Sequence, residues 1–310
     1  MSGVSTSRTN GGDAREVAFG ARRVVLTNLD KVLWPRTGFT KGAMIEYYER
    51  ASGVLLPHIQ GRPLTLGRFP DGIDGPGFAQ TECRGRPEWM STRPIRTRAG
   101  DLRRFCVVDD VASLLWVANQ NAIELHAFLS GADDLDEPLA VAFDLDPGPG
   151  RGLLDSCRVA LSLRDYLGDV GLAAFPKTTG GRGLHVFVPI DAGHTYPETK
   201  PFAREVADRL AAAHPDLVTS GTRGAERAGR VAVDWAQNSR MRTTVVPYSL
   251  RSADLPLVST PLRWDEVEEV IRAGTAERLA LGPDEIPDRV ARHGDPFAPV
   301  LRLSQSLVRP

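Results

Sequence analysis

Two aspartates at the end of an apolar run are the residues best suited to chemistry in this sequence. Asp144 and Asp146 close the segment AVAFDLDP, which spans residues 140–147. In a β-strand the side chains of residues i and i+2 point to the same face, so these two carboxylates project together. Hard cations such as Mg²⁺ and Mn²⁺ take oxygen ligands, commonly one or two carboxylates together with substrate phosphates. The spacing therefore favours a divalent-cation site, with a pair of solvated strand-end acids as the alternative.

A third carboxylate follows another short apolar run. Asp234 lies in RVAVDWAQN, residues 230–238, next to Gln237 and close to several arginines. Three acids from two strands can bridge two cations about 3.5 to 4 Å apart, where one cation activates an attacking hydroxyl and the other neutralises a pyrophosphate leaving group. Arginine and amide side chains around such a centre would bind the rest of a triphosphate. Together these residues favour phosphoryl or nucleotidyl transfer.

A glycine-rich turn lies between these two segments, in PKTTGGRGLHV, residues 176–186. Its glycines let backbone amides approach a ligand closely, and Thr179, Arg182 and His185 add side-chain donors. The turn has neither the G-x-x-x-x-G-K pattern of a Walker loop nor the G-x-G-x-x-G pattern of a dinucleotide fold. It fits a phosphate-binding turn, whereas an ordinary hairpin with a core histidine is the alternative.

Lysine is rare in this chain, and two of the four lysines lie ten residues apart, at Lys31 and Lys41. Thr40 can cap a helix whose apolar side includes Met44 and Tyr48. A lysine in the first turn of such a helix faces the N-terminal amides, where phosphate is readily bound. The alternative is that Lys41 is merely exposed.

The elements that must position these residues interleave without a regular alternation of strand and helix. Strands are predicted at residues 22–27, 63–69, 105–108, 139–146, 173–176, 184–189, 230–235 and 243–247, and helices at 42–55, 111–121, 153–167, 201–213 and 264–272. This order favours an α+β fold. Residues 1–20 are polar and rich in Gly, Ser and Thr, so we expect a disordered arm there, then one domain over 21–295 and a tail over 296–310.

The composition is that of a globular protein, with 42% hydrophobic and 25% charged residues in 310. The sequence lacks both an apolar run long enough to span a membrane and a secretory signal, so we expect a cytoplasmic protein. The net charge is −1, but arginines cluster at 84–104 and 223–251, where they can bind phosphates or form ordinary solvated faces. Cys83, Cys106 and Cys157 show no C-x-x-C spacing, and we expect reduced thiols.

Taken in order, the segments FDLDPG, TGGRGLHV and VDWAQN resemble the hallmarks of the archaeo-eukaryotic primase superfamily, and within it the polymerase domain of bacterial DNA ligase D. The segments TNLDKVLWP and PYSLR are further matches. The resemblance implies an α+β primase-like catalytic core, with mixed or antiparallel sheets flanked by helices. It also implies a template-dependent nucleotidyltransferase, a primase-polymerase that uses two Mn²⁺ or Mg²⁺ ions. Such an enzyme adds NTPs or dNTPs to DNA primer ends and fills short gaps in double-strand break repair by non-homologous end joining.

The resemblance also implies roles for individual residues. The metal-binding catalytic triad is matched by Asp144, Asp146 and Asp234. Positions that bind the incoming nucleotide are matched by His126, Thr179, Arg182, His185, Arg227, Gln237 and Arg251. The pocket for the 5′-phosphate across a DNA gap is matched by Asn28, Lys31 and Lys41, and the template-stacking position by Phe78.

The chain departs from the family pattern at two places. Ala79 follows Phe78 where the family commonly has two adjacent aromatics, so template stacking would rest on Phe78 alone. Arg182 and Thr179 stand where lysine and serine are usual, which keeps the charge and the hydroxyl but replaces a point charge with a planar fork.

The implied partners are DNA with gaps or broken ends, Ku and a DNA ligase, with no membrane and a location at the bacterial nucleoid. Because no K-x-D-G ligase motif occurs, we expect a stand-alone polymerase that meets its ligase in trans. Two other functions compete with this one. A D-x-D glycosyltransferase would explain Asp144 and Asp146 but not Asp234 or the lysine pair. A non-catalytic DNA-end-binding module would not need all three acids.

Overall fold

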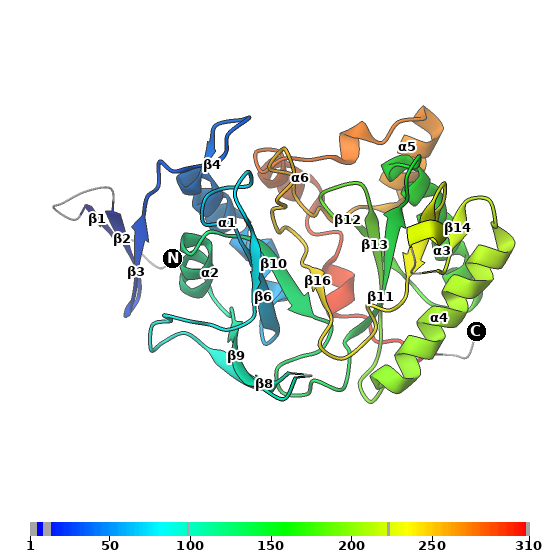
Figure 1. Cartoon of the computed structure of the whole chain (residues 1–310), viewed down its shortest axis with the longest axis horizontal. Coiled ribbons are helices and arrows are strands. Elements are labelled where there is room, and N and C mark those ends of the chain that lie inside the picture. The colour runs from blue at the N-terminus through cyan, green and yellow to red at the C-terminus, as the bar shows by residue number, and fades with distance from the viewer. Residues whose placement is uncertain (1–4, 9–13, 98, 222–223, 308–310) are drawn as a thin grey trace.

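Two sheets carry the fold, which the computed structural model describes for residues 5–8, 14–97, 99–221 and 224–307 (Figure 1). The first sheet has the strand order β16-β10-β6-β9-β8, with β7 paired to β6, and the second has the order β12-β13-β11-β15-β14. Every pairing in the two sheets is antiparallel except that of β14 with β15. The first sheet comprises β6 (Pro63–Arg68), β7 (Phe78–Gln80), β8 (Thr92–Arg96), β9 (Leu102–Val107), β10 (Ala122–Phe128) and β16 (Thr243–Val245). The second comprises β11 (Ala140–Pro147), β12 (Phe175–Thr178), β13 (Leu184–Pro189), β14 (Val218–Thr219) and β15 (Val231–Asp234). The predicted α+β class is confirmed.

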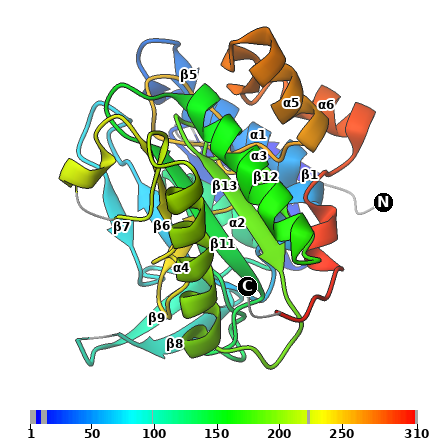
Figure 2. The same ribbon diagram turned by 90° about the vertical axis from the view of Figure 1, so that its right-hand side faces the viewer.

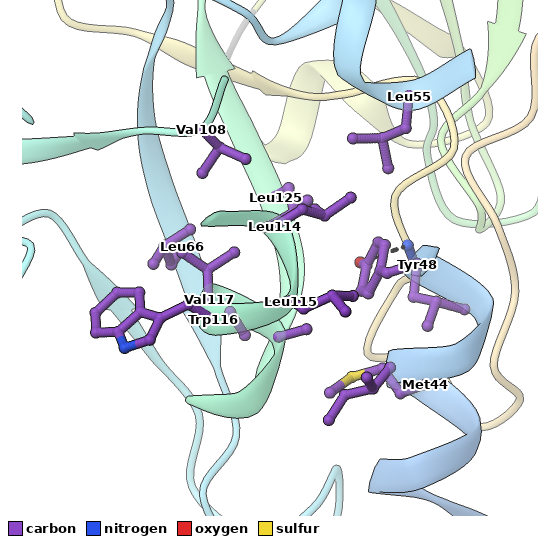
Figure 3. Close-up of a cluster of buried hydrophobic side chains, with 14 of the residues drawn as sticks. Met44, Tyr48, Leu55, Leu66, Val108, Leu114, Leu115, Trp116, Val117 and Leu125 are labelled. Carbon is purple, nitrogen blue, oxygen red and sulfur yellow. Dashed lines mark hydrogen bonds between the residues drawn. The ribbon is translucent and has the colours of Figure 1, made fainter. Parts of the chain in front are cut away.

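Helices α1 (Lys41–Leu55) and α2 (Val111–Asn119) cover the first sheet and enclose the larger apolar core (Figure 3). Met44 and Tyr48 of α1 pack there with Leu115 of α2, as the predicted apolar side of α1 requires. The predicted cap is confirmed, since Thr40 Oγ1 accepts the Ala43 amide at 3.2 Å. The short hairpin of β4 (Val32–Trp34) and β5 (Phe39–Thr40) leads into α1.

Helices α3 (Leu153–Asp169) and α4 (Tyr196–Ala213) run side by side over one face of the second sheet (Figure 2). Alternation along β11 explains this packing, because Val141, Phe143 and Leu145 all enter the core formed with those helices. The residues between them, Ala142 and Asp144, face the other side. Helix α5 (Trp264–Ala273) packs on α3, and α6 (Ile286–His293) lies near α1.

The expectation of a disordered arm over 1–20 is wrong for the part of it that the structure describes. β1 (Ser5–Arg8), β2 (Ala14–Phe19) and β3 (Arg22–Thr27) form an antiparallel sheet, whereas residues 1–4 and 9–13 lie outside the described ranges. Val17 and Val24 are buried in the larger core, and this apolar contact outweighs the polar composition. At the other end of the chain Phe297 is also buried, so the segment after 295 packs onto the domain.

The expectation of three reduced cysteines is also wrong. Cys83 and Cys106 form a disulfide, and Cys157 is free and buried. The Cys83 amide bonds the Arg104 carbonyl at 2.7 Å, so the pairing follows from neighbouring backbone and needs no short sequence spacing. None of the helices in the described ranges combines the length and apolar character that crossing a membrane requires.

Candidate active site

Strand register brings the three predicted acids together on one face of the second sheet. Asp144 on β11 lies directly opposite Asp234 on β15, and Asp146 follows two residues along β11. Directly opposed residues on antiparallel strands have Cα atoms about 4.5 to 5.5 Å apart. The side-chain alternation of a strand turns Asp146 to the same face as Asp144. The trio therefore lies at one end of the sheet, and its predicted role in binding cations stays a prediction.

Protein donors bind two of the three carboxylates. Arg227 Nη2 donates to Asp146 Oδ2 at 2.7 Å, and the Ala236 amide donates to Asp234 Oδ1 at 2.8 Å. Asp144 Oδ1 differs, because it is buried and has no hydrogen-bond partner within the described ranges. A group of three or more acidic, histidine or cysteine side chains already arranged around one metal position does not occur in those ranges. Ligation by all three acids would therefore require Asp146 to turn from Arg227.

The electrostatics of the trio favour added positive charge. Burial raises the pKa of Asp146, and the neighbouring carboxylates of Asp144 and Asp234 raise it further, although Arg227 opposes them. Burial also works against ionisation of Asp144, but His185 and Lys177 outweigh it and hold its pKa below the usual value. Oxygen donors and the mutual repulsion of neighbouring carboxylates fit hard divalent cations such as Mg²⁺ or Mn²⁺.

His185 supports Asp144 as a neutral imidazole. Its Nε2 lies 3.3 Å from Asp144 Oδ1, a contact that would be an ion pair only with a protonated ring. Burial and then the Lys177 charge lower the pKa of His185 to about 4, so the ring is uncharged at neutral pH. His185, which was predicted as part of the glycine-rich turn, therefore also contacts the Asp144 carboxylate.

The glycine-rich turn borders an open cleft of about 560 Å³ next to the acids. The cleft is lined by Asp146, Pro147, Gly148, Pro149, Thr179, Gly181, Arg182, Gly183, Arg227 and Arg251. Position 183 requires glycine because the backbone of the turn lies close to β11, and a Cβ atom there would be 2.8 Å from the Leu145 carbonyl oxygen. Gly180 has φ +72° and leaves room for the Arg251 stem. Backbone amides and three guanidinium groups thus meet at one opening, as an anionic ligand requires.

Glu124, which the sequence reasoning missed, contacts two of the predicted nucleotide-binding residues. It lies on β10 and contacts His126 Nε2 at 2.8 Å and Arg251 Nε at 3.2 Å. It also accepts bonds from the Ser252 amide and hydroxyl. Burial opposes its ionisation, but His126 and Arg251 lower its pKa to about 2. The i,i+2 spacing of Glu124 and His126 was the sequence signal that could have revealed it.

Gln237, Arg182 and Thr179 each make a contact within the protein. Gln237 Nε2 lies 3.4 Å from Asp234 Oδ2, so its amide belongs to the acid cluster in this structure. Arg182 lines the cleft and donates to the Arg151 carbonyl. Thr179 Oγ1 donates to the Gly183 carbonyl at 3.2 Å, which closes the turn.

The predicted 5′-phosphate residues lie together, around the β4–β5 hairpin. The Lys31 amide bonds the Asn28 carbonyl, and the Lys41 amide bonds the Lys31 carbonyl at 2.8 Å. Burial, then Lys31 and Arg68, lower the pKa of Lys41 to about 8. The Lys31 amine contacts Asp71 at 3.2 Å. A cluster of cations that lowers the pKa of Lys41 is suited to an anion.

Phe78 lies on β7 and is 49% exposed. The Arg68 guanidinium lies 5.5 Å from the centre of its ring. An exposed aromatic face next to a cation is a surface on which a nucleobase can stack.

Comparisons with known proteins give one consistent result. The family described as "LigD, primase-polymerase domain" matches residues 40–297. The multifunctional non-homologous end joining DNA repair protein LigD of Mycobacterium tuberculosis (strain H37Rv) is 40% identical over 283 residues, which cover 88% of this chain and 36% of that protein. The bifunctional LigD of Bacillus subtilis (strain 168) is 28% identical over 284 residues, or 91% of this chain and 45% of that protein. The chain thus spans less than half the length of these relatives.

Among solved structures, the polymerase domain from Mycobacterium tuberculosis ligase D in complex with DNA matches with a TM-score of 0.83 and 37% identity. The match covers 91% of this chain and 99% of that domain. The shared fold is that of the archaeo-eukaryotic primases, as the sequence analysis expected.

Proposed function

This chain belongs to the LigD primase-polymerase domain family, and on that premise we propose that it is a nucleotidyltransferase that extends DNA primers and fills short gaps at broken ends. The observation that carries the proposal is the register that sets Asp144 opposite Asp234. Asp146, two residues along the same strand as Asp144, lines a cleft bordered by arginines and a glycine-rich turn. Acids alone would not indicate the reaction, but acids next to a triphosphate-sized cationic opening support it.

Asp144, Asp146 and Asp234 would hold two divalent cations. Such ions, when bound, supply activation of the primer 3′-hydroxyl and neutralisation of the pyrophosphate leaving group. His185 orients the Asp144 carboxylate from 3.3 Å away. Arg227 now pairs with Asp146 and would exchange that carboxylate for a phosphate oxygen.

The remaining residues of the cleft would bind and orient the nucleotide. Arg251 and Arg182 offer planar forks that match phosphate oxygens, and the amides of the turn add neutral donors. Glu124 holds His126 and Arg251 in place. Gln237, next to Asp234, would complete the contacts to the triphosphate.

Gapped DNA is the substrate that we propose. The similar solved domain is in complex with DNA, which supports the same class of ligand for this chain. Phe78 would stack on a template base, a contact worth about 1 to 3 kcal/mol. Similar proteins carry end-joining names, and we propose Ku and a DNA ligase as the partners of this chain.

Primer extension on gapped DNA tests the proposal. Purified protein with Mn²⁺ or Mg²⁺, a templated one-nucleotide gap and each NTP or dNTP should yield a product extended by the templated nucleotide. A protein that binds the DNA but never extends it would be a non-catalytic end-binding module. Turnover of a nucleotide sugar instead would indicate a glycosyltransferase.

The double variant Lys31→Ala with Lys41→Ala should erase the preference for a 5′-phosphorylated gap over a hydroxyl end. Each lysine that contacts a phosphate adds to the affinity through its charge. Loss of both should therefore weaken binding to 5′-phosphorylated DNA by about tenfold or more. Extension and fluorescence anisotropy on matched phosphorylated and unphosphorylated gaps measure it. Equal losses on both substrates would contradict the assignment.

A further inference from the structure

Lys177, on β12, is a fully buried lysine to which the proposed reaction gives no task. Its side chain is 0% exposed, and its amine donates to Ser259 Oγ at 2.7 Å. Within the ranges that the structure describes, no carboxylate forms an ion pair with it. Burial lowers its pKa well below the usual value, with Arg251 acting in the same direction and Asp144 opposing. Methionine would fill the same space without burying an amine, so the lysine costs stability that folding alone does not explain.

The position of Lys177 connects it to the acids. It lies opposite His185 on β13, His185 lies opposite Asp144 on β11, and Asp144 lies opposite Asp234 on β15. These four residues form a single row across neighbouring strands of the second sheet. Lys177 thus occupies the end of the row that is farthest from Asp234.

Its partner Ser259 belongs to the segment that carries Arg251. Ser259 exchanges backbone bonds with residues 248–249, since its amide donates to the Ser249 carbonyl and its carbonyl accepts the Tyr248 amide. The Arg251 amide in turn donates to the Leu257 carbonyl at 2.9 Å. Ser259 is therefore fixed to both strands of the loop in which Arg251 lies.

The same hydroxyl ties this loop to the glycine-rich turn. Ser259 Oγ accepts from Lys177 and donates to the Thr178 carbonyl at 2.9 Å. A Cβ atom on Gly180 would lie 2.5 Å from Arg251 Cγ and 3.1 Å from the Ser259 amide, so the turn and the loop are in direct contact. Loss of the lysine donor would leave Ser259 Oγ with one hydrogen bond, to the Thr178 carbonyl, instead of two, and the contact between turn and loop would be less fixed.

We propose that Lys177 is a positioning residue, whose bond to Ser259 fixes Arg251 against the glycine-rich turn so that the guanidinium meets the triphosphate of the incoming nucleotide. The inference rests on the proposed function and deepens it. Lys177 touches no substrate in this account and acts through Ser259 and Arg251. The buried amine of Lys177 lowers the stability of the fold, and in return the nucleotide pocket is ordered before the nucleotide binds.

Three variants test this: Lys177→Met, Ser259→Ala and the two together. Single-nucleotide extension gives kcat and KM for the nucleotide, and anisotropy of a fluorescent ATP with Mn²⁺ gives its affinity without turnover. Each single variant should lower kcat/KM about tenfold, mainly by raising KM, and the double variant should lose no more than either single one. The thermal midpoint of Lys177→Met should equal or exceed that of wild type. Arg272→Met, at an exposed position of α5, is the control for loss of a cation and should behave as wild type.

Several outcomes would overturn the inference. One is a kcat/KM for Lys177→Met within about twofold of wild type. Another is a double variant whose loss in kcat/KM equals the product of the two single losses. A loss confined to kcat would mean that Lys177 acts on the acids rather than on Arg251. If Lys177→Met does not fold, an unchanged nucleotide KM in Ser259→Ala refutes the inference. Failure of the wild type to extend any primer would reject the proposed function instead, and nucleotide binding would still test Lys177.

Discussion

Asp234→Ala should lower primer extension by at least about 10³-fold, the loss typical of removing a main electrostatic element of an active site. Asp234 supplies the only carboxylate that β15 brings to the row, and it lies directly opposite Asp144. The fold should persist, because Val231 and Val233 of the same strand remain in the core. Extension under single-turnover conditions measures the loss, and anisotropy on gapped DNA should show affinity near that of wild type.

The matched control is Asp169→Ala, an exposed aspartate at the end of α3. It should extend primers as wild type does. Extension by Asp234→Ala within about tenfold of wild type would contradict its assigned role, since such a loss is too small for an acid of the reaction centre.

Glu124→Gln should weaken both the nucleotide pocket and the fold. The pKa of Glu124 is lowered from 4.5 to about 2 in the folded protein. A shift of that size corresponds to about 3 kcal/mol of stability in the ionised form. Because the folded-state pKa is lowered, this stability is present above pH 4.5 and is lost as the pH falls towards 2. The variant should therefore be less stable at neutral pH. Its free energy of unfolding should also fall less steeply than that of wild type as the pH decreases below 4.5.

Urea unfolding of wild type and Glu124→Gln between pH 7 and pH 3 tests the direction of this pH dependence. The gap between their free energies of unfolding should narrow as the pH falls below 4.5, the unshifted value for this acid. Nucleotide KM should rise about tenfold, because Arg251 and His126 lose the charge that holds them. Glu46→Gln, on the exposed side of α1, is the control. A gap that stays constant with pH would contradict the ionic role of Glu124.

The sequence was most informative where chemistry follows from short-range patterns. Alternation in AVAFDLDP placed Asp144 and Asp146 on one face of a strand, and Thr40 marked the start of α1. The register of β11 with β15 could not be obtained in this way, because it joins residues about 90 positions apart and depends on the packing of the whole sheet. For Asp234 the short apolar run indicated a third acid, and the family resemblance grouped it with the other two.

Buried charge was the main feature that the sequence did not reveal. Lys177 and Glu124 look like ordinary polar residues in the sequence, and only tertiary packing shows that both are enclosed. The N-terminal sheet was missed for a related reason, since a few buried valines decide its structure and polar neighbours dominate its composition. The Cys83–Cys106 pair likewise depends on two strands that meet in space.

The central claim is that Asp144, Asp146 and Asp234 together bind the cations that the reaction needs. Electron paramagnetic resonance of free Mn²⁺, titrated with protein and a non-hydrolysable nucleotide, counts the bound ions directly. The account predicts two bound Mn²⁺ ions for wild type and at most one for Asp234→Ala. Two ions bound equally well by both proteins, or none by wild type, would contradict it.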